Sequence, residues 1–258
     1  MISTVENDQD QELFNRIAAA YIRKDILPAH RLARINRLEQ TMSILPVSGK
    51  IDILEVGCGA GFSADYLSGR YRRYLGIDYS RELIKYANKY NLRDGVEFRA
   101  TDITELKTSD RFDLVLMIGV LHHVALIPRF MESSLKFLKP LGWVVANEPN
   151  QGNPAVRIVR KIRKKVDSHY SASQRSFSGS QLIEIFEASG LSMIQSRPQG
   201  IFSTPFAEII MPMQKVTTLM SRYACLFDKI LEKKGFEATW CMSWNIIVAG
   251  QKRDLCTY

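Results

Sequence analysis

The sequence predicts an α/β fold built on a doubly wound, mostly parallel sheet. Three observations carry this prediction. Short apolar runs of strand length recur along the chain, segments with the apolar spacing of helices separate them, and a glycine-rich turn follows the first run. Strands that alternate with helices indicate βαβ units, whose crossovers are right-handed.

Seven segments are predicted as strands, each a short apolar run: 51–56, 74–78, 96–100, 112–118, 143–146, 191–196 and 244–249. Helices are expected between them at 62–67, 81–91, 129–138 and 182–188. The last helix begins with a capping box formed by Ser178 and Gln181, and Gly190 ends it. The fold expected is therefore a seven-stranded sheet with helices on its faces.

Three segments fall outside this alternation and are candidates for a lid over the crevice at the carboxyl ends of the strands. Residues 1–46 are expected to form an N-terminal helical lid that Pro28 divides into two helices. Residues 151–177 form a basic insertion. Residues 201–240 are expected to form a helical cap. Within it, the strongly apolar stretch 203–234 is expected to form one or two amphipathic helices, kinked near Pro212.

The composition is that of a globular chain, with 46% hydrophobic and 24% charged residues. The net charge is +8, and residues 151–175 carry seven Lys/Arg against one acid. One local basic patch is weaker evidence for nucleic acid than a basic field over the whole molecule, so no stable nucleic-acid partner is expected.

Within the basic insertion, residues 156–166 place four apolar side chains on one helical face: Val156, Val159, Ile162 and Val166. Three interpretations stay open. The segment is a solvated helix docked by its apolar face, a contact with an anionic membrane surface, or a site for an anionic substrate or carrier protein.

Neither targeting nor metal binding is indicated. The first residues are polar and acidic, which predicts no signal peptide, and no apolar run reaches transmembrane length. The four cysteines (Cys58, Cys225, Cys241 and Cys256) have the spacing of neither a zinc site nor a disulfide framework. A reducing cytoplasm is therefore the expected location.

The most informative stretch runs from Glu55 through Gly57, Cys58 and Gly59 to Gly61. Glycines let the backbone turn sharply and let a ligand approach it, and the helix that follows favours an anionic group at its N-terminus. The third glycine comes one residue too early for a dinucleotide fingerprint. An acid beside this loop would repel a pyrophosphate but attract an ammonium group. The loop therefore favours the methionine end of S-adenosylmethionine.

Two acids follow the next two strands in order. Asp78 ends the second strand, where a carboxylate binds both hydroxyls of a ribose. Asp102 ends the third strand, where a carboxylate can accept a hydrogen bond from an adenine amino group. Together with the glycine loop, these acids predict an adenosyl ligand along this edge.

On these residues the sequence resembles the class I S-adenosylmethionine-dependent methyltransferases of Rossmann-like fold, particularly the group related to ubiquinone and menaquinone methyltransferases. The matching segments are 53–61, 75–80, 99–103, 112–124 and 138–142. Leu141 departs from the family pattern, which has glycine there. The resemblance covers about residues 50–150. The order of predicted elements makes residues 47–150 the cofactor-binding half of a single domain, whose sheet is completed by 178–200 and 241–251.

The resemblance also implies roles for single residues. Gly57, Gly59 and Gly61 surround the methionine moiety, and Asp78, Asp102 and Ile103 hold ribose and adenine. Tyr79 packs on the adenine, while Ile118 and Gly119 follow the cofactor through their backbone. Tyr21 is a candidate to close over the cofactor, against a plainer role in core packing.

For chemistry, methyl transfer from a sulfonium needs alignment, and a general base helps where the acceptor is a hydroxyl or an acidic carbon. His122, His123 and Glu148 follow the fourth and fifth strands at the crevice. The resemblance makes them candidates for proton transfer, with a pocket-shaping role as the alternative for the histidines.

The function expected is methyl transfer to a small organic acceptor, at oxygen or carbon, with a lipid-like or polycyclic acceptor as the sharper hypothesis. An RNA methyltransferase is the first alternative, because of the basic patch. A nicotinamide oxidoreductase is the second, and a non-catalytic cofactor-binding subunit the third.

Overall fold

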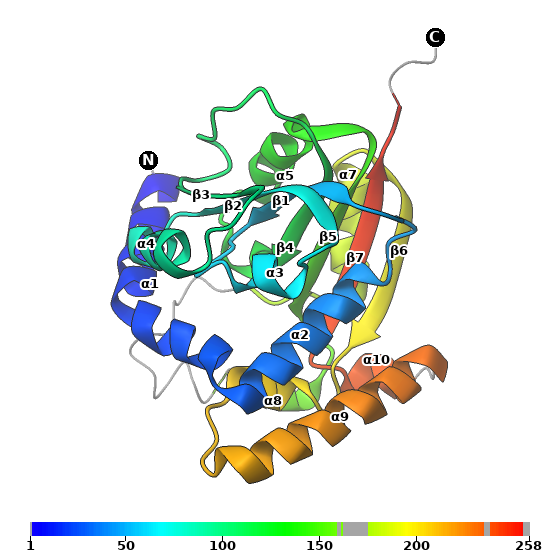
Figure 1. Ribbon diagram of the computed structural model, residues 1–258. Helices are drawn as coiled ribbons and strands as arrows, with labels where there is room; N and C mark the ends of the chain where they lie inside the picture. The colour runs from blue at the N-terminus through cyan, green and yellow to red at the C-terminus, as the bar shows by residue number, and fades with distance from the viewer. Residues whose placement is uncertain (1, 159–160, 162–174, 235–237, 255–258) are drawn as a thin grey trace.

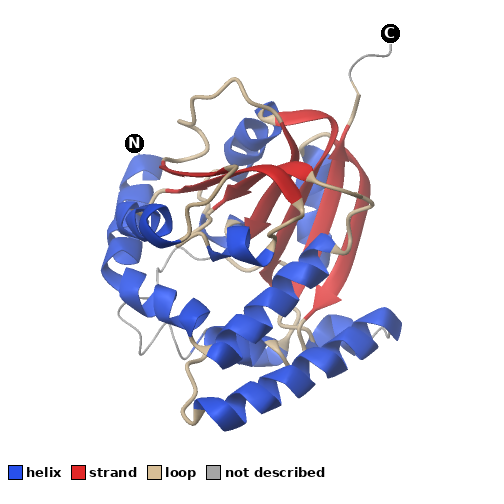
Figure 2. Cartoon of the chain, in the orientation of Figure 1, coloured by secondary structure: helices blue, strands red, loops and turns tan. Residues whose placement is uncertain are grey.

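The sheet predicted from the sequence is present, with seven strands in the order β3-β2-β1-β4-β5-β7-β6 (Figures 1 and 2). The computed structural model describes residues 2–158, 161, 175–234 and 238–254. The strands are β1 (Ile51–Val56), β2 (Tyr71–Asp78), β3 (Val96–Ala100), β4 (Phe112–Ile118), β5 (Leu138–Pro149), β6 (Leu191–Gln199) and β7 (Asn245–Lys252). β7 runs antiparallel to both β5 and β6, and the other pairings are parallel.

Helices cover both faces of this sheet. They are α1 (Ile2–Ile26), α2 (Pro28–Met42), α3 (Phe62–Tyr66), α4 (Arg81–Tyr90), η1 (Leu121–His123), α5 (Ile127–Lys136), α7 (Gly179–Ala188), α8 (Thr204–Glu208), α9 (Gln214–Lys234) and α10 (Ala238–Met242). Alternate residues of the strands build two cores, one under α5 and α7 and one under α2, α3 and α4. The central strands are apolar on both faces because both faces are covered.

The N-terminal segment forms two helices, as predicted. Leu27 has an extended backbone and Pro28 takes the first position of α2, where its missing N–H breaks no hydrogen bond. The first helix begins nine residues earlier than the apolar spacing indicates, at Ile2. Ser178 and Gln181 form the predicted capping box of α7, and Gly190 follows that helix with a φ of +80°.

The apolar segment after β6 forms two separate helices, α8 and α9. Of the two predicted alternatives, one helix or two, the structure has two, and the interruption near Pro212 is a loop between Glu208 and Gln214. α9 lies along the outside of the molecule and packs on α2 (Figure 1). Most of the basic insertion, including Val159, Ile162 and Val166, lies outside the described residues, as does Cys256; Val156 is buried.

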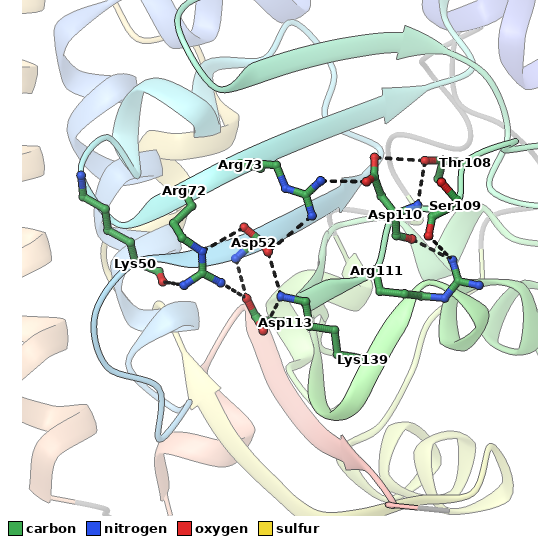
Figure 3. A network of polar contacts seen from close by, with 10 residues as sticks. All are labelled: Lys50, Asp52, Arg72, Arg73, Thr108, Ser109, Asp110, Arg111, Asp113 and Lys139. Carbon is green, nitrogen blue, oxygen red and sulfur yellow. Dashed lines mark hydrogen bonds and ion pairs between the residues drawn. The ribbon is translucent and has the colours of Figure 1, made fainter.

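A network of charged side chains ties the strands together at their amino ends, opposite the glycine loop (Figure 3). Lys139 of β5 donates to Asp52 of β1 (2.8 Å) and to Asp113 of β4 (3.0 Å). Arg72 of β2 reaches the same two carboxylates. Burial opposes the ionised form of Asp52, but its hydrogen bonds to Lys139 and the arginines hold its pKa down at about 2. Among the described helices, none has both the length and the apolar character that a membrane span requires.

Candidate functional site

The glycine loop joins β1 to α3 in a conformation that its glycines make possible. Gly57, Gly59 and Gly61 all have positive φ, between 54° and 77°. A Cβ on Gly57 would stand 2.6 Å from Val120, and one on Gly61 would stand 2.5 Å from Phe98. A Cβ on Gly59 would meet nothing within 4 Å, so the loop presents bare backbone at that residue.

Most amides of the loop are already bonded inside the protein. The N–H groups of Gly57 and Cys58 both donate to the carbonyl of Ile77, and Gly61 donates to Cys58. The Gly59 N–H donates to Asp78 Oδ2 at 2.9 Å. The loop therefore lets a ligand approach its backbone closely, but most of its amides are not available to bind an anion.

Asp78 connects the loop to the end of β2. Its second oxygen accepts a hydrogen bond from the Ser80 N–H at 2.8 Å. Burial raises the pKa of this carboxyl, while the two amides work in the opposite direction. Asp102 follows β3 at the same edge and accepts hydrogen bonds from the backbone and the hydroxyl of Thr104 (2.8 and 2.6 Å), and Ile103 is buried beside it.

Glu55 and Cys58 are turned into the protein. The Tyr74 hydroxyl donates to the Glu55 carboxylate, and burial raises the pKa of Glu55 to about 7. The Cys58 thiol packs against Gly76, where a Cβ would stand 2.9 Å from its sulfur, and burial raises its pKa well above the ordinary value. Cys58 thus fills space between loop and sheet, as its small apolar character suggests.

The turn after β4 is organised by Glu148. This carboxylate is fully buried at the end of β5 and accepts hydrogen bonds from the N–H groups of Val120 (2.8 Å) and Leu121 (2.7 Å). Its other oxygen lies 2.7 Å from His122 Nδ1. The charge of His122 and these hydrogen bonds outweigh burial and lower the pKa of Glu148. Gly119 begins the same turn with a φ of +68°, and its N–H donates to the carbonyl of Asn147 beside Ile118.

His123 lies between the turn after β4 and α1. Its ring lies 4.1 Å from the ring of His122 and 5.3 Å from that of Phe14 on α1 (centroid distances). Phe14 also meets the edge of Tyr79, with centroids 5.8 Å apart. A row of aromatic rings therefore runs from Tyr79 at the end of β2, through Phe14 of α1, to the histidines that follow β4.

Polar contacts fix α1 in this position. Gln11 donates to the carbonyl of Tyr79 at 2.6 Å, and Asn15 accepts a hydrogen bond from the Ser80 hydroxyl at 2.8 Å. Ala18 packs in one apolar cluster with Ala60 of the glycine loop. α1 therefore covers both the glycine loop and the end of β2.

Tyr21 lies one helical turn beyond Ala18 on α1, and its side chain packs against α2. Its ring contacts Phe14 edge-on (5.6 Å between centroids), and the guanidinium of Arg34 stands 5.6 Å from its centroid. Burial, reinforced by the charge of Glu208, raises the pKa of its hydroxyl. Phe14, on the same helix, is in ring contact with both Tyr79 and His123.

Sequence reasoning missed two groups of residues at this edge. Gln11, Phe14 and Asn15 were visible only as part of a helical pattern. Asn147 and Gln199 are buried side by side at the ends of β5 and β6, with Asn147 Nδ2 3.4 Å from Gln199 Oε1. Asn147 Oδ1 and Gln199 Nε2 have no partner among the described atoms, which leaves an acceptor and a donor for water or a ligand. Polar residues at two strand ends were the signal available for this pair.

Comparisons with known proteins lead to methyltransferases. Residues 54–146 match the family described as "Methyltransferase domain". A ubiquinone biosynthesis O-methyltransferase of Bradyrhizobium diazoefficiens is 30% identical over 125 residues, which are 47% of this chain and 49% of that protein. The chain spans about half the length of these curated relatives.

Solved structures share the fold over nearly the whole chain. A SAM-dependent methyltransferase of Thermotoga maritima superposes with a TM-score of 0.68 at 21% identity, covering 95% of this chain and 100% of that one. The plantazolicin methyltransferase BpumL, solved with SAH, has a TM-score of 0.60 at 16% identity and covers 96% of this chain and 95% of its own. At these identities the likeness establishes the Rossmann-like fold.

Proposed function

The chain belongs to the class I S-adenosylmethionine-dependent methyltransferases, and from this premise we propose that it transfers a methyl group to a small organic acceptor. One observation carries the proposal furthest. The backbone amide of Gly59 and the carboxylate of Asp78 are bonded at the carboxyl edge of β1 and β2, with open space beside Gly59. This arrangement suits an adenosyl amino acid that lies along the edge.

Several residues would hold the cofactor. Gly57, Gly59 and Gly61 would border its methionine portion, and Asp78 would accept from the ribose hydroxyls in place of a backbone amide. Tyr79, Asp102 and Ile103 would surround the adenine. Bound there, the sulfonium supplies an activated methyl group, so the protein mainly aligns the acceptor with it.

Residues around the turn after β4 have separate proposed roles. His123 is the candidate proton acceptor, because it is half-buried and its ring lies after β4, in contact with Phe14 of α1. Glu148 positions the turn, since both of its oxygens already accept hydrogen bonds or contact His122. Ile118 and Gly119 would follow the cofactor through their backbone, and Glu55 would support the loop from below.

The acceptor we propose is a small molecule methylated on a hydroxyl oxygen, in line with the names of the curated relatives. A nicotinamide cofactor is less well supported, because the family match and the shared fold both lead to methyltransferases. An RNA acceptor is less well supported, because the named curated relatives are methyltransferases of ubiquinone biosynthesis. α1 and the α8–α9 segment are the proposed lid and cap of this acceptor site.

Cofactor binding is tested by thermal unfolding with S-adenosylmethionine, S-adenosylhomocysteine or NADH. A ligand at about 1,000 times its Kd adds roughly 4 kcal/mol, which raises the Tm by roughly 8 °C or more. We expect this rise with the first two ligands and its loss in Asp78→Ala. Asp94→Ala, an exposed acid before β3, is the matched control and should keep the rise. A rise with NADH alone would overturn the proposal.

A further inference from the structure

α9 (Gln214–Lys234) is held to the molecule along one side. On that side the Ser221 hydroxyl donates to the carbonyl of Ala29 in α2 at 2.8 Å. The fully buried Asp228 accepts the N–H groups of residues 201–203 at 2.8 to 3.1 Å. These contacts fix the rotation of the helix about its axis, and with it the residues that face outward.

The opposite side of α9 is apolar and uncovered by described residues. It carries the apolar stripe, whose members recur every three or four positions and are each 52–55% exposed: Val216, Leu219, Met220, Tyr223, Leu226 and Phe227. Six large apolar side chains on one helical face exceed the scattered exposure that soluble proteins normally show. Such a surface is expected to meet another apolar phase.

The charges of α9 are sorted between its two sides. Lys215, Arg222 and Lys229 are exposed and follow one another at intervals of seven, so they form a row beside the stripe; Lys229 also reaches Glu39 of α2. The acids turn inward: Asp228 is buried, and Glu232 accepts the Gly200 N–H at 2.8 Å. Among the described side chains of α9, every exposed charge is positive.

This charge pattern distinguishes the occupants that an apolar stripe can have. A second copy packed stripe to stripe in the antiparallel sense would bring two rows of cations together, and like charges at an interface are costly. An anionic bilayer accepts both features at once, because apolar side chains enter the acyl boundary while Lys and Arg meet the headgroups. Leucine and phenylalanine at the centre with a tyrosine among them are typical of helices that lie in this interface.

We propose that α9 is an interfacial helix that docks the protein on anionic lipid surfaces through the apolar stripe and its row of cations. The cations attract the protein to the surface, and the stripe supplies the burial that holds it there. Because this binding requires neither cofactor nor acceptor, it stands or falls independently of the proposed methyl transfer.

Co-sedimentation with vesicles tests the proposal on the full chain. Vesicles of phosphatidylcholine mixed with phosphatidylglycerol should bind the protein, less so as salt is raised, and phosphatidylcholine alone should bind it weakly. Arg222→Gln should weaken binding roughly fivefold, the contribution of one cation near a membrane. The double variant Leu219→Ser/Phe227→Ser should bind at least as poorly.

Two matched variants serve as controls. Leu92→Ser changes an apolar residue of similar exposure (55%) in the loop between α4 and β3, and Arg70→Gln removes a cation from the turn before β2. Both should bind like the unmodified chain, and since all these positions are exposed, the Tm should hardly change. Equal binding by all variants, or no binding to anionic vesicles, overturns the proposal. A dimer that Leu219→Ser/Phe227→Ser dissociates, with no vesicle binding, would assign the stripe to a second copy.

Discussion

Leu141 has a backbone conformation that residues with a Cβ disfavour. It has a φ of 60° where residues 139–142 of β5 bulge opposite the single residue Asp113. A left-handed backbone destabilises the folded protein by roughly 1–2 kcal/mol at a residue with a Cβ. Glycine avoids this strain, but its unfolded chain is more flexible, which offsets about 0.5–1 kcal/mol of the gain. The Leu141 side chain is 54% exposed, and the hydrogen bond from Gln251 goes to its carbonyl, so a glycine keeps the local contacts.

We therefore expect Leu141→Gly to raise the free energy of unfolding by about 0.5–1 kcal/mol. Urea unfolding measures the change. Leu141→Ala is the matched control, because alanine removes the same apolar surface but keeps the Cβ, and it should bring no gain. If the glycine and alanine variants are equally stable, the turn does not hold the strain that its φ indicates.

At the scale of the elements, the sequence predicted what local signals determine. The capping box at Ser178 fixes the start of α7, and the glycine loop fixes the turn after β1, because each signal lies within a few residues of the feature that it produces. The contacts of α1 were not predictable in this way. Phe14 reaches Tyr79 and His123 across more than sixty residues of sequence, and no local pattern encodes such a contact.

The same limit applies to α9. Its apolar spacing predicts a helix, yet the spacing alone does not say which side is buried. The buried side is determined by Asp228 and Glu232, because both carboxylates accept hydrogen bonds from the loop after β6. In the candidate site, glycines and acids at strand ends were named because their positions follow from the βαβ order. The roles of Glu148 and His122 in the turn after β4 depend on side-chain directions that only the structure provides.

The position of α1 predicts that this helix slows the dissociation of the bound cofactor. Phe14 joins α1 to the edge through two edge-to-face ring pairs, each contributing about 0.5–1.5 kcal/mol. Phe14→Ala should loosen α1 and let S-adenosylhomocysteine dissociate roughly tenfold faster, as stopped-flow displacement would measure. Ile26→Ala changes an exposed residue (57%) at the end of the same helix and should leave the rate unchanged. An unchanged rate in Phe14→Ala would mean that α1 does not cover the bound cofactor.

At the scale of the whole molecule, buried carboxyls make stability depend on pH. Burial raises the pKa of Glu55 and of Glu232 from 4.5 to about 7. The unfolded chain loses these protons near pH 4.5, whereas the folded chain keeps them until about 7, so stability falls as the pH rises between those values. Asp52 acts in the opposite sense: its pKa is lowered to about 2, so its contribution is present above 3.8 and is lost as the pH falls toward 2.

These groups together predict that the unliganded protein is most stable at mildly acidic pH and loses stability toward neutrality. Each raised carboxyl contributes as much as about 3 kcal/mol to that loss. Glu55→Gln and Glu232→Gln keep the shape of the side chain without its charge, so each should flatten the decline and the double variant should flatten it most. Urea unfolding at intervals from pH 4.5 to 7.5 measures the slope, with the exposed Glu132→Gln as control. A decline of the same slope in the double variant would show that other groups set the pH dependence, and that these two buried carboxyls ionise as readily in the folded protein as in the unfolded chain.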